Sequence, residues 1–357
     1  MKKYLAILTT SILLCTATGG RAQDIHFSQF WENNILLNPA LTGVFSGDYK
    51  VGVDYRSQWS TLVNPYKTFM ISGETRVLVS REVGDYISFG LVYTNDKAGS
   101  INFTSNQLYP AICYNKALED ERNSYLSVGL TGGYISRNVD MSLMKFSNQY
   151  QAGNYDQNNP TGETFVYNGL SNYDVGAGVS LNSSLDMQSR SNYYLGVGVY
   201  HINSPTVLFN GGNTLVKLPM KWQFNGGIYL PLNEQFSFTA RANFAVQQPY
   251  QELLFGGMVT WKALQVGLPS IFAFHFGVFS RYQDAIIPVI KFDYKQVSLG
   301  FSYDVNNSSL SSQAGTGTSA TEITLYVRGN YNHRKNPRDG VMCPRFEDDP
   351  NPGNTFR

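Results

Sequence analysis

Residues 193–200 read Tyr193-Tyr194-Leu195-Gly196-Val197-Gly198-Val199-Tyr200, a run in which apolar side chains alternate with glycine or tyrosine. The stretch Val297–Asp304 alternates in the same way, and similar stretches recur throughout Asp48–Tyr331. Successive side chains of a β-strand point to opposite faces, so a period of two predicts strands with two chemically different faces. Strands of about 9–11 residues are long enough to cross a bilayer at a tilt. The pattern predicts an all-β fold, an antiparallel transmembrane β-barrel of the outer membrane.

Turn residues divide this region into about fourteen strands, an even number that is typical of bacterial outer-membrane barrels. The expected strands begin near Asp48, Lys67, Tyr86, Asn106, Ser124, Tyr173, Asn192, Met220, Gln235, Glu252, Ile271, Ala285, Gln296 and Glu322. The connections after odd-numbered strands are mostly long, and they cover residues 57–66, 95–105, 136–172, 202–219 and 305–321. Outer-membrane barrels have long external loops and short periplasmic turns. The pattern therefore predicts that both chain termini are periplasmic.

The N-terminal residues Met1–Ala22 have the features of a secretory signal peptide. Lys2 and Lys3 form its positive region, and Tyr4–Cys15 is an apolar core too short to span a membrane as a helix. Small residues precede Gln23, so we expect cleavage there. The predicted export is a condition for an outer-membrane location.

Three further segments follow the signal peptide. Residues 23–47 form an N-terminal periplasmic or plug segment, because they do not alternate and are rich in aromatic and apolar side chains. Residues 48–331 form the barrel. Residues 332–357 form a polar, proline-containing C-terminal tail, which we expect to be extended.

Charged residues within the expected strands mostly share a face with small or polar neighbours. They are Asp54, Arg56, Glu74, Arg76, Arg241, Lys291, Asp293 and Arg328. An Arg or Lys on the lipid face costs about 2–4 kcal/mol near the bilayer midplane. The charges are therefore expected in a polar lumen, although the solvated face of a soluble β-sandwich has the same pattern.

The composition favours a membrane barrel and limits the functions. The chain has 24 Tyr, 22 Phe and 4 Trp, and such rings suit membrane interfaces. It also has 33 Gly, which within strands indicates curvature or close packing. A net charge of +1 gives no electrostatic basis for binding nucleic acid. Cys113 and Cys343 are either paired or separate thiols.

No known catalytic or ligand motif is present. The chain lacks a Gly-x-Ser-x-Gly elbow, a phosphate-binding glycine loop and a Cys-x-x-Cys pair. Its histidines, His26, His201, His275 and His333, are far apart in sequence and lack metal-site spacing. We expect no enzyme activity, no cofactor and no metal.

Several stretches together resemble the PorP/SprF family over nearly the whole expected mature chain. They are Asp24-Ile25-His26-Phe27-Ser28-Gln29-Phe30-Trp31, Leu37-Asn38-Pro39-Ala40-Leu41-Thr42-Gly43, Val51–Trp59, Phe301–Asn306 and Cys343-Pro344-Arg345-Phe346. The resemblance implies an outer-membrane barrel of the type IX secretion system that is not catalytic. It further implies partners among the secretion and gliding machinery proteins, and an exported surface protein, such as an adhesin, that the barrel helps to export or anchor.

The family-like stretches also supply candidate residues for partner binding or for plugging the barrel. They are His26, Phe27, Phe30, Trp31, Asn38, Pro39, Tyr55, Arg56 and Trp59. Buried aromatic side chains are frequent anchors of protein contacts, but the same rings also suit packing inside the barrel. For Tyr55 and Trp59 we favour membrane-interface positions, and for Arg56 a lumen position. A passive porin or small-solute channel remains the alternative function.

Overall fold

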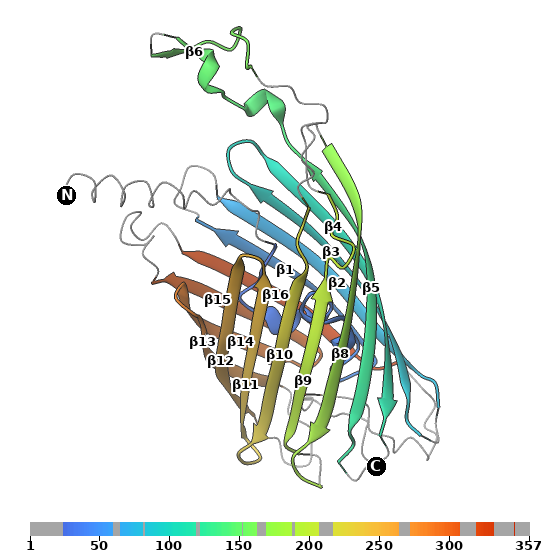
Figure 1. Cartoon of the computed structure of the whole chain (residues 1–357). Coiled ribbons are helices and arrows are strands. Elements are labelled where there is room, and N and C mark those ends of the chain that lie inside the picture. The colour runs from blue at the N-terminus through green and yellow to red at the C-terminus, as the bar shows by residue number, and fades with distance from the viewer. Residues whose placement is uncertain are drawn as a thin grey trace, which may run out of the picture.

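The computed structural model describes residues 24–59, 65–80, 83–118, 122–151, 153–162, 169–187, 190–206, 217–263, 272–307, 319–331 and 346. Within these residues, antiparallel strands form a closed barrel in which each strand pairs with its neighbours along the chain and β1 pairs with β16 (Figure 1). The barrel has 14 strands, as predicted. No helix in the described part of the chain is long and apolar enough to cross a membrane.

The strand bounds follow the alternating pattern closely. The barrel strands are β1 (Tyr49–Gln58), β2 (Tyr66–Leu78), β3 (Tyr86–Ala98), β4 (Phe103–Ala117), β5 (Tyr125–Asn138), β8 (Gly169–Ser184), β9 (Asn192–Tyr200), β10 (Lys221–Pro231), β11 (Phe236–Gln247), β12 (Tyr250–Lys262), β13 (Phe272–Arg281), β14 (Ala285–Tyr294), β15 (Val297–Asn306) and β16 (Ala320–Gly329). The largest difference from the expected starts is at β8, which begins at Gly169 rather than at Tyr173.

The longest connections share one end of the barrel, which we call the long-loop mouth. They comprise residues 139–168, 201–220 and 307–319. The first of them carries a two-stranded hairpin, β6 (Tyr150–Gln151) and β7 (Asn154–Tyr155), which extends beyond the barrel (Figure 1). The opposite end, where β1 begins and β16 ends, is the short-turn mouth.

The prediction of a long connection over residues 95–105 is wrong. β3 continues to Ala98 and β4 starts at Phe103, so only residues 99–102 form the turn. The polar side chains that suggested a loop instead pair between strands. Asn95 Nδ2 donates to Asn106 Oδ1 at 2.7 Å, and Thr68 Oγ1 donates to Asp96 Oδ1 at 2.6 Å.

The two faces of the barrel wall differ as the alternation predicts. On β5, Val128 and Leu130 are exposed on the outer face, whereas Ser127 and Thr131 are buried inside. The charged strand residues expected in the lumen also point inward: Asp54, Arg56, Glu74, Arg76, Arg241, Lys291 and Asp293 are buried, and the Arg328 side chain is 17% exposed.

A charge placed on the outer face is expected to destabilise the barrel. Leu130 lies near the middle of β5 and is 56% exposed outside the barrel. A Leu130→Arg substitution should cost about 2–4 kcal/mol in a bilayer, because the guanidinium enters hydrocarbon. Unfolding of the purified protein in lipid vesicles by urea measures this cost. Leu130→Gln is the uncharged control, and equal losses for both variants would contradict a lipid-facing position.

Residues 24–48, which we call the lumen segment, run through the inside of the barrel. They contain three short helical turns, η1 (Phe30–Glu32), α2 (Asn34–Leu37) and η2 (Pro39–Leu41), and residues 27–35 are all buried. Asp24 lies beside His201 and Lys221 at the long-loop mouth. At the other end, the Asp48 backbone N–H donates to Gly329 O at 2.7 Å.

This path takes the chain through the barrel before the first strand begins, but the two termini lie outside the described residues, so the expectation that both are periplasmic stays a prediction. The described chain starts at the long-loop mouth with Asp24 and leaves the last barrel strand at the short-turn mouth with Gly329. Contacts with His201 and Lys221 hold Asp24 beside the ends of β9 and β10. The lumen segment therefore crosses the barrel from the long-loop mouth to the short-turn mouth, where β1 begins and β16 ends.

Candidate functional site: the occupied lumen

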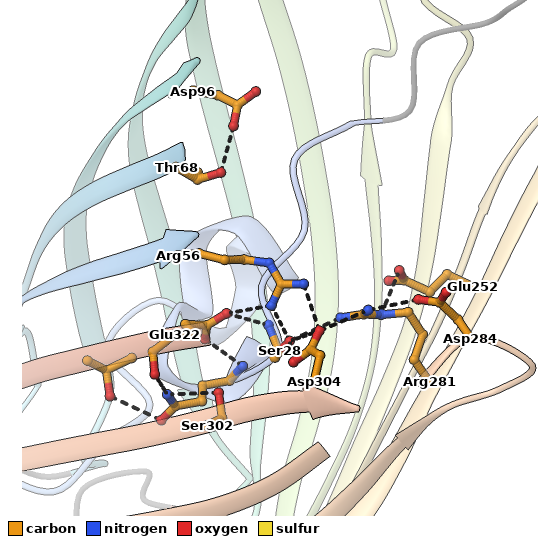
Figure 2. Close-up of polar contacts among 12 residues, drawn as sticks. Ser28, Arg56, Thr68, Asp96, Glu252, Arg281, Asp284, Ser302, Asp304 and Glu322 are labelled. Carbon is orange, nitrogen blue, oxygen red and sulfur yellow. Dashed lines mark hydrogen bonds and ion pairs between the residues drawn. The ribbon is translucent and has the colours of Figure 1, made fainter. Parts of the chain in front are cut away.

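Arg56 is the centre of a buried ion cluster that attaches the lumen segment to the barrel (Figure 2). Its guanidinium lies 3.1 Å from Glu322 Oε2, across the seam where β1 meets β16, and 2.8 Å from Asp304 Oδ2 on β15. The Glu322 carboxylate also accepts the backbone N–H groups of Ser28 and Gln29, each at 2.7 Å. One carboxylate therefore ties the first and last barrel strands to the lumen segment.

Arg281 extends this cluster toward β12 and the turn after β13. Its Nη1 lies 3.2 Å from Asp304 Oδ2 and 2.9 Å from Asp284 Oδ2, and its Nε lies 3.4 Å from Glu252 Oε2. His26 of the lumen segment lies close enough to this cluster to interact electrostatically with Glu252 and Arg281.

Glu32 attaches the middle of the lumen segment to the barrel wall through lysines of β1 and β14. Its Oε1 lies 2.6 Å from Lys291 Nζ, and its Oε2 lies 3.4 Å from Lys50 Nζ. The Glu32 side chain is only 6% exposed, so removing either lysine leaves its buried carboxylate with one ion-pair partner fewer.

Asp24 attaches the start of the lumen segment at the long-loop mouth. Its Oδ2 lies 3.2 Å from Lys221 Nζ and 3.5 Å from His201 Nε2. On its other side, His201 Nδ1 lies 2.8 Å from Asp174 Oδ2, which also accepts a hydrogen bond from the Tyr109 hydroxyl at 2.7 Å. The imidazole therefore bridges a wall carboxylate and the lumen segment.

This attachment is expected to weaken as the pH rises. Burial lowers the pKa of His201, but its contacts with Asp174 and Asp24 outweigh burial and raise the pKa above 6.5. Its contribution is complete below pH 6.5 and is lost as the pH rises through the folded-state pKa. For Asp24, burial raises the pKa, but Lys221 and His201 outweigh it, so this contribution is lost only in acid.

The difference in unfolding temperature between wild type and His201→Asn measures this effect, since other titrating groups cancel in the difference. We expect the difference to be largest between about pH 4 and 6.5 and to shrink toward pH 9. A difference that stays constant from pH 5 to pH 9 would show that the imidazole charge does not hold Asp24.

The aromatic side chains of the lumen segment pack against opposite walls of the barrel. Phe27 joins a buried cluster with Met70, Val92 and Tyr109 from β2, β3 and β4. Trp31 instead stacks on Phe279 of β13, with ring centroids 4.2 Å apart. The segment is thus held on both sides of the lumen by apolar contacts.

Asn38 and Pro39 occupy a cradle of glycines on the wall formed by β5, β8 and β9. Asn38 Nδ2 donates to Val179 O at 3.2 Å, and its Oδ1 accepts the Ala40 N–H at 2.9 Å, which begins η2. A Cβ atom at Gly129 would lie 2.2 Å from the Pro39 carbonyl carbon, and one at Gly178 would lie 1.9 Å from Asn38 Oδ1. Inward-facing glycine is required here because backbone lies directly against the wall.

The structure brings most of the candidate residues together inside the barrel, with two exceptions. His26, Phe27, Phe30, Trp31, Asn38, Pro39 and Arg56 are inside. Tyr55 is 42% exposed on the outer face, next to the inward Arg56. Trp59 follows the end of β1, where its ring lies 4.7 Å from the Tyr66 ring.

The sequence analysis missed several residues on which the site depends. On the lumen segment these are Ser28, Gln29 and Glu32, and on the strands they are Arg281, Asp304 and Glu322. The strand residues stand on the inward phase of β13, β15 and β16, which is the signal that could have found them. Phe346 of the C-terminal tail was also missed. It is buried inside the barrel beside Tyr194 of β9.

A comparison with known protein families matches the part of the chain that contains these residues. The model of the family described as type IX secretion system membrane protein PorP/SprF matches residues 20–326. The chain belongs to the PorP/SprF family. This match covers the lumen segment and most of the barrel, so the occupied lumen lies within the part of the chain that defines the family relationship.

Solved structures share the barrel fold of this PorP/SprF chain. The toluene transporter TodX of Pseudomonas putida has a TM-score of 0.50 and 10% identity, over 85% of this chain and 95% of TodX. The toluene transporter TbuX of Ralstonia pickettii has a TM-score of 0.49 and 11% identity, over 83% of this chain and 93% of TbuX. No curated protein sequence matches. Fold and family together indicate an outer-membrane protein of the type IX secretion system.

Proposed function

We propose that this protein is a non-catalytic component of the type IX secretion and gliding machinery that helps export a surface protein, such as an adhesin, or anchors it at the cell surface. The observation that carries this proposal is the lumen segment, which occupies the barrel from one mouth to the other. Its buried ion pairs and aromatic contacts leave partner binding to the two mouths.

The orientation follows from the lengths of the connections. We propose that the short-turn mouth faces the periplasm, as in other outer-membrane barrels. The long-loop mouth then faces the outside with residues 139–168 and the β6–β7 hairpin, and it is the proposed contact surface for the exported protein. The short-turn mouth is the proposed contact surface for the periplasmic secretion machinery.

Affinity purification from native cells tests the proposal. We expect the tagged wild-type barrel to recover secretion-machinery proteins and a secreted surface protein. Replacing residues 139–168 with a two-residue turn should lose the surface protein and keep the machinery. The same replacement of residues 307–319 at the same mouth is the matched control. Recovery of phospholipid alone by the wild type would overturn the proposal.

Conductance in a planar bilayer tests the alternative of a passive porin. The purified protein is expected to give no steady current, because the lumen segment and its ion clusters fill the interior. A large, steady, ohmic current from the wild type would instead support a small-solute channel.

A further inference from the structure

Two lysines face each other on the outer surface of the barrel, next to the long-loop mouth. Lys67 is near the start of β2 and Lys97 is near the end of β3, and the two are direct partners across this strand pair. Both side chains are exposed on the outer face of the wall, in phase with the outward residues Phe69 and Leu91. Residues directly opposite each other in an antiparallel pair have Cβ atoms about 4.5–5.5 Å apart, so one anion can contact both ammonium groups.

Among the residues that the structure describes, no carboxylate forms an ion pair with either lysine. The nearest carboxylate in sequence, Asp96, points into the barrel, where it accepts a hydrogen bond from Thr68 Oγ1 at 2.6 Å (Figure 2). The two connections that flank the pair, residues 59–65 and 99–102, contain no charged residue. The outward residues of the same row on the adjoining strands are also uncharged: Thr321, Ser57, Thr104 and Asn138. The pair is therefore a local excess of positive charge on the outer face.

An outward lysine at the opposite end of the same wall has a protein partner. The Lys116 side chain of β4 is 43% exposed, and its Nζ lies 3.1 Å from Asp85 Oδ2 beside the short-turn mouth. The chain thus supplies a carboxylate to this lysine, whereas the described residues supply none to Lys67 and Lys97. Cationic side chains at a membrane surface attract anionic lipid headgroups, so the membrane is the source of an anion for the pair.

The position of the pair along the strands corresponds to the level of the lipid headgroups. Tyr55 and Phe69 are exposed aromatic partners one outward row nearer the middle of the barrel. The next outward row contains Ile71 and Tyr93. Aromatic side chains of outer-membrane barrels form girdles at the membrane interfaces. Lys67 lies beyond Phe69 by about 7 Å along the strand, which places its ammonium group outside the hydrocarbon.

We propose that Lys67 and Lys97 form a binding site for the phosphate monoester of a lipid headgroup in the outer leaflet. Such a group carries a charge of about −1.5 to −2 at pH 7 and has three acceptor oxygens, so it can contact both ammonium groups. The acyl chains of the same lipid lie along the exposed side chains of Phe69, Ile71 and Leu91. The placement in the outer leaflet rests on the proposed orientation of the barrel, whereas the site itself rests on strand register and charge.

Native mass spectrometry of the full-length protein in a neutral detergent tests the site. The probe is lipid A, which carries phosphate monoesters, and the comparison lipid is the same lipid A with its phosphates removed. We expect the wild type to bind lipid A at least ~10-fold more tightly than the dephosphorylated form, because two cations contribute. Lys67→Gln with Lys97→Gln should lose this difference. Lys262→Gln with Lys295→Gln, which removes as many cations at the short-turn mouth, is the matched control and should keep it.

A second pair of lipids tests the charge of the headgroup. Phosphatidic acid has a phosphate monoester, and phosphatidylglycerol with the same acyl chains has a phosphodiester with a single charge. We expect the wild type to bind phosphatidic acid more tightly, because only the monoester approaches the charge of the two lysines. Inorganic phosphate added to the complex should not displace the lipid, since the acyl chains contribute to its binding.

Each outcome decides the matter. A preference for phosphate monoesters that Lys67→Gln with Lys97→Gln abolishes and the control variant keeps supports the site. Equal binding of lipid A and its dephosphorylated form to the wild type overturns it, as does an unchanged preference in the double variant, equal binding of phosphatidic acid and phosphatidylglycerol, or displacement by inorganic phosphate. Heat-modifiable mobility on gels confirms that each variant is a folded barrel. Binding in detergent needs no secretion partner, so a failure here is distinct from a failure of the affinity purification.

Discussion

Arg56→Ala is expected to release the lumen segment and to destabilise the protein by about 3–5 kcal/mol, the usual cost of removing one partner from a buried ion pair. Arg56 is 1% exposed, so solvent does not screen its interactions. Without the guanidinium, the buried Glu322 carboxylate loses its ion pair with Arg56, and Asp304 keeps only its ion pair with Arg281. Glu322 also holds the Ser28 and Gln29 backbone, so its rearrangement loosens the segment.

Chymotrypsin measures the release of the segment, because Phe27, Phe30 and Trp31 are buried cleavage sites in the intact protein. The variant should be cut between these residues while the barrel strands stay protected, and its unfolding temperature should fall. Lys67→Ala removes an exposed cation from neighbouring β2 and should change neither quantity.

A charge-neutral triple variant separates the ion pairs from the volume of the arginine side chain. Arg56→Met with Asp304→Asn and Glu322→Gln leaves no uncompensated charge, so it should recover much of the stability lost in Arg56→Ala. If the triple variant is as unstable as Arg56→Ala, packing rather than charge holds the segment.

The barrel could be predicted from sequence because each strand carries its own signal. Alternation at Tyr55 and Arg56 is enough to place one side chain outside the barrel and the next inside. In the structure Tyr55 is exposed on the outer face and Arg56 is buried in the lumen. The even strand number and the inward charges follow from the same local pattern. Residues 95–98 were assigned to a loop because the hydrogen bonds of Asn95 and Asp96 to neighbouring strands are not visible in the local sequence.

The ion clusters could not be predicted, since they depend on register across the closed barrel. Arg56 and Glu322 are direct partners in the seam between β1 and β16, although they are far apart in sequence. Nothing local to either residue indicates the other. Phe346 was missed for a different reason: a polar, proline-containing tail predicts an extended chain, and a single buried ring does not change that composition.

A glycine of the barrel wall gives the second prediction with a large effect on stability. Gly129→Ala is expected to displace the turn at Asn38–Ala40 and to cost about 1–3 kcal/mol, the usual cost of overpacking. The added Cβ would lie 2.2 Å from the Pro39 carbonyl carbon and 2.4 Å from the Ala40 nitrogen, which are backbone atoms and cannot rotate away. The Ala40 carbonyl is also fixed, because it accepts hydrogen bonds from Cys113 Sγ at 3.4 Å and Ser180 Oγ at 3.2 Å.

The same strand provides the control for this prediction. Gly132 of β5 faces outward, and a Cβ atom there would meet nothing within 4 Å. Gly132→Ala should therefore be neutral or slightly stabilising, since alanine loses less backbone entropy than glycine on folding. Unfolding temperature and chymotrypsin cleavage of the lumen segment should change in Gly129→Ala alone. If both variants lose stability equally, the glycines serve the curvature of the wall, and the close contact with Pro39 is not what requires them.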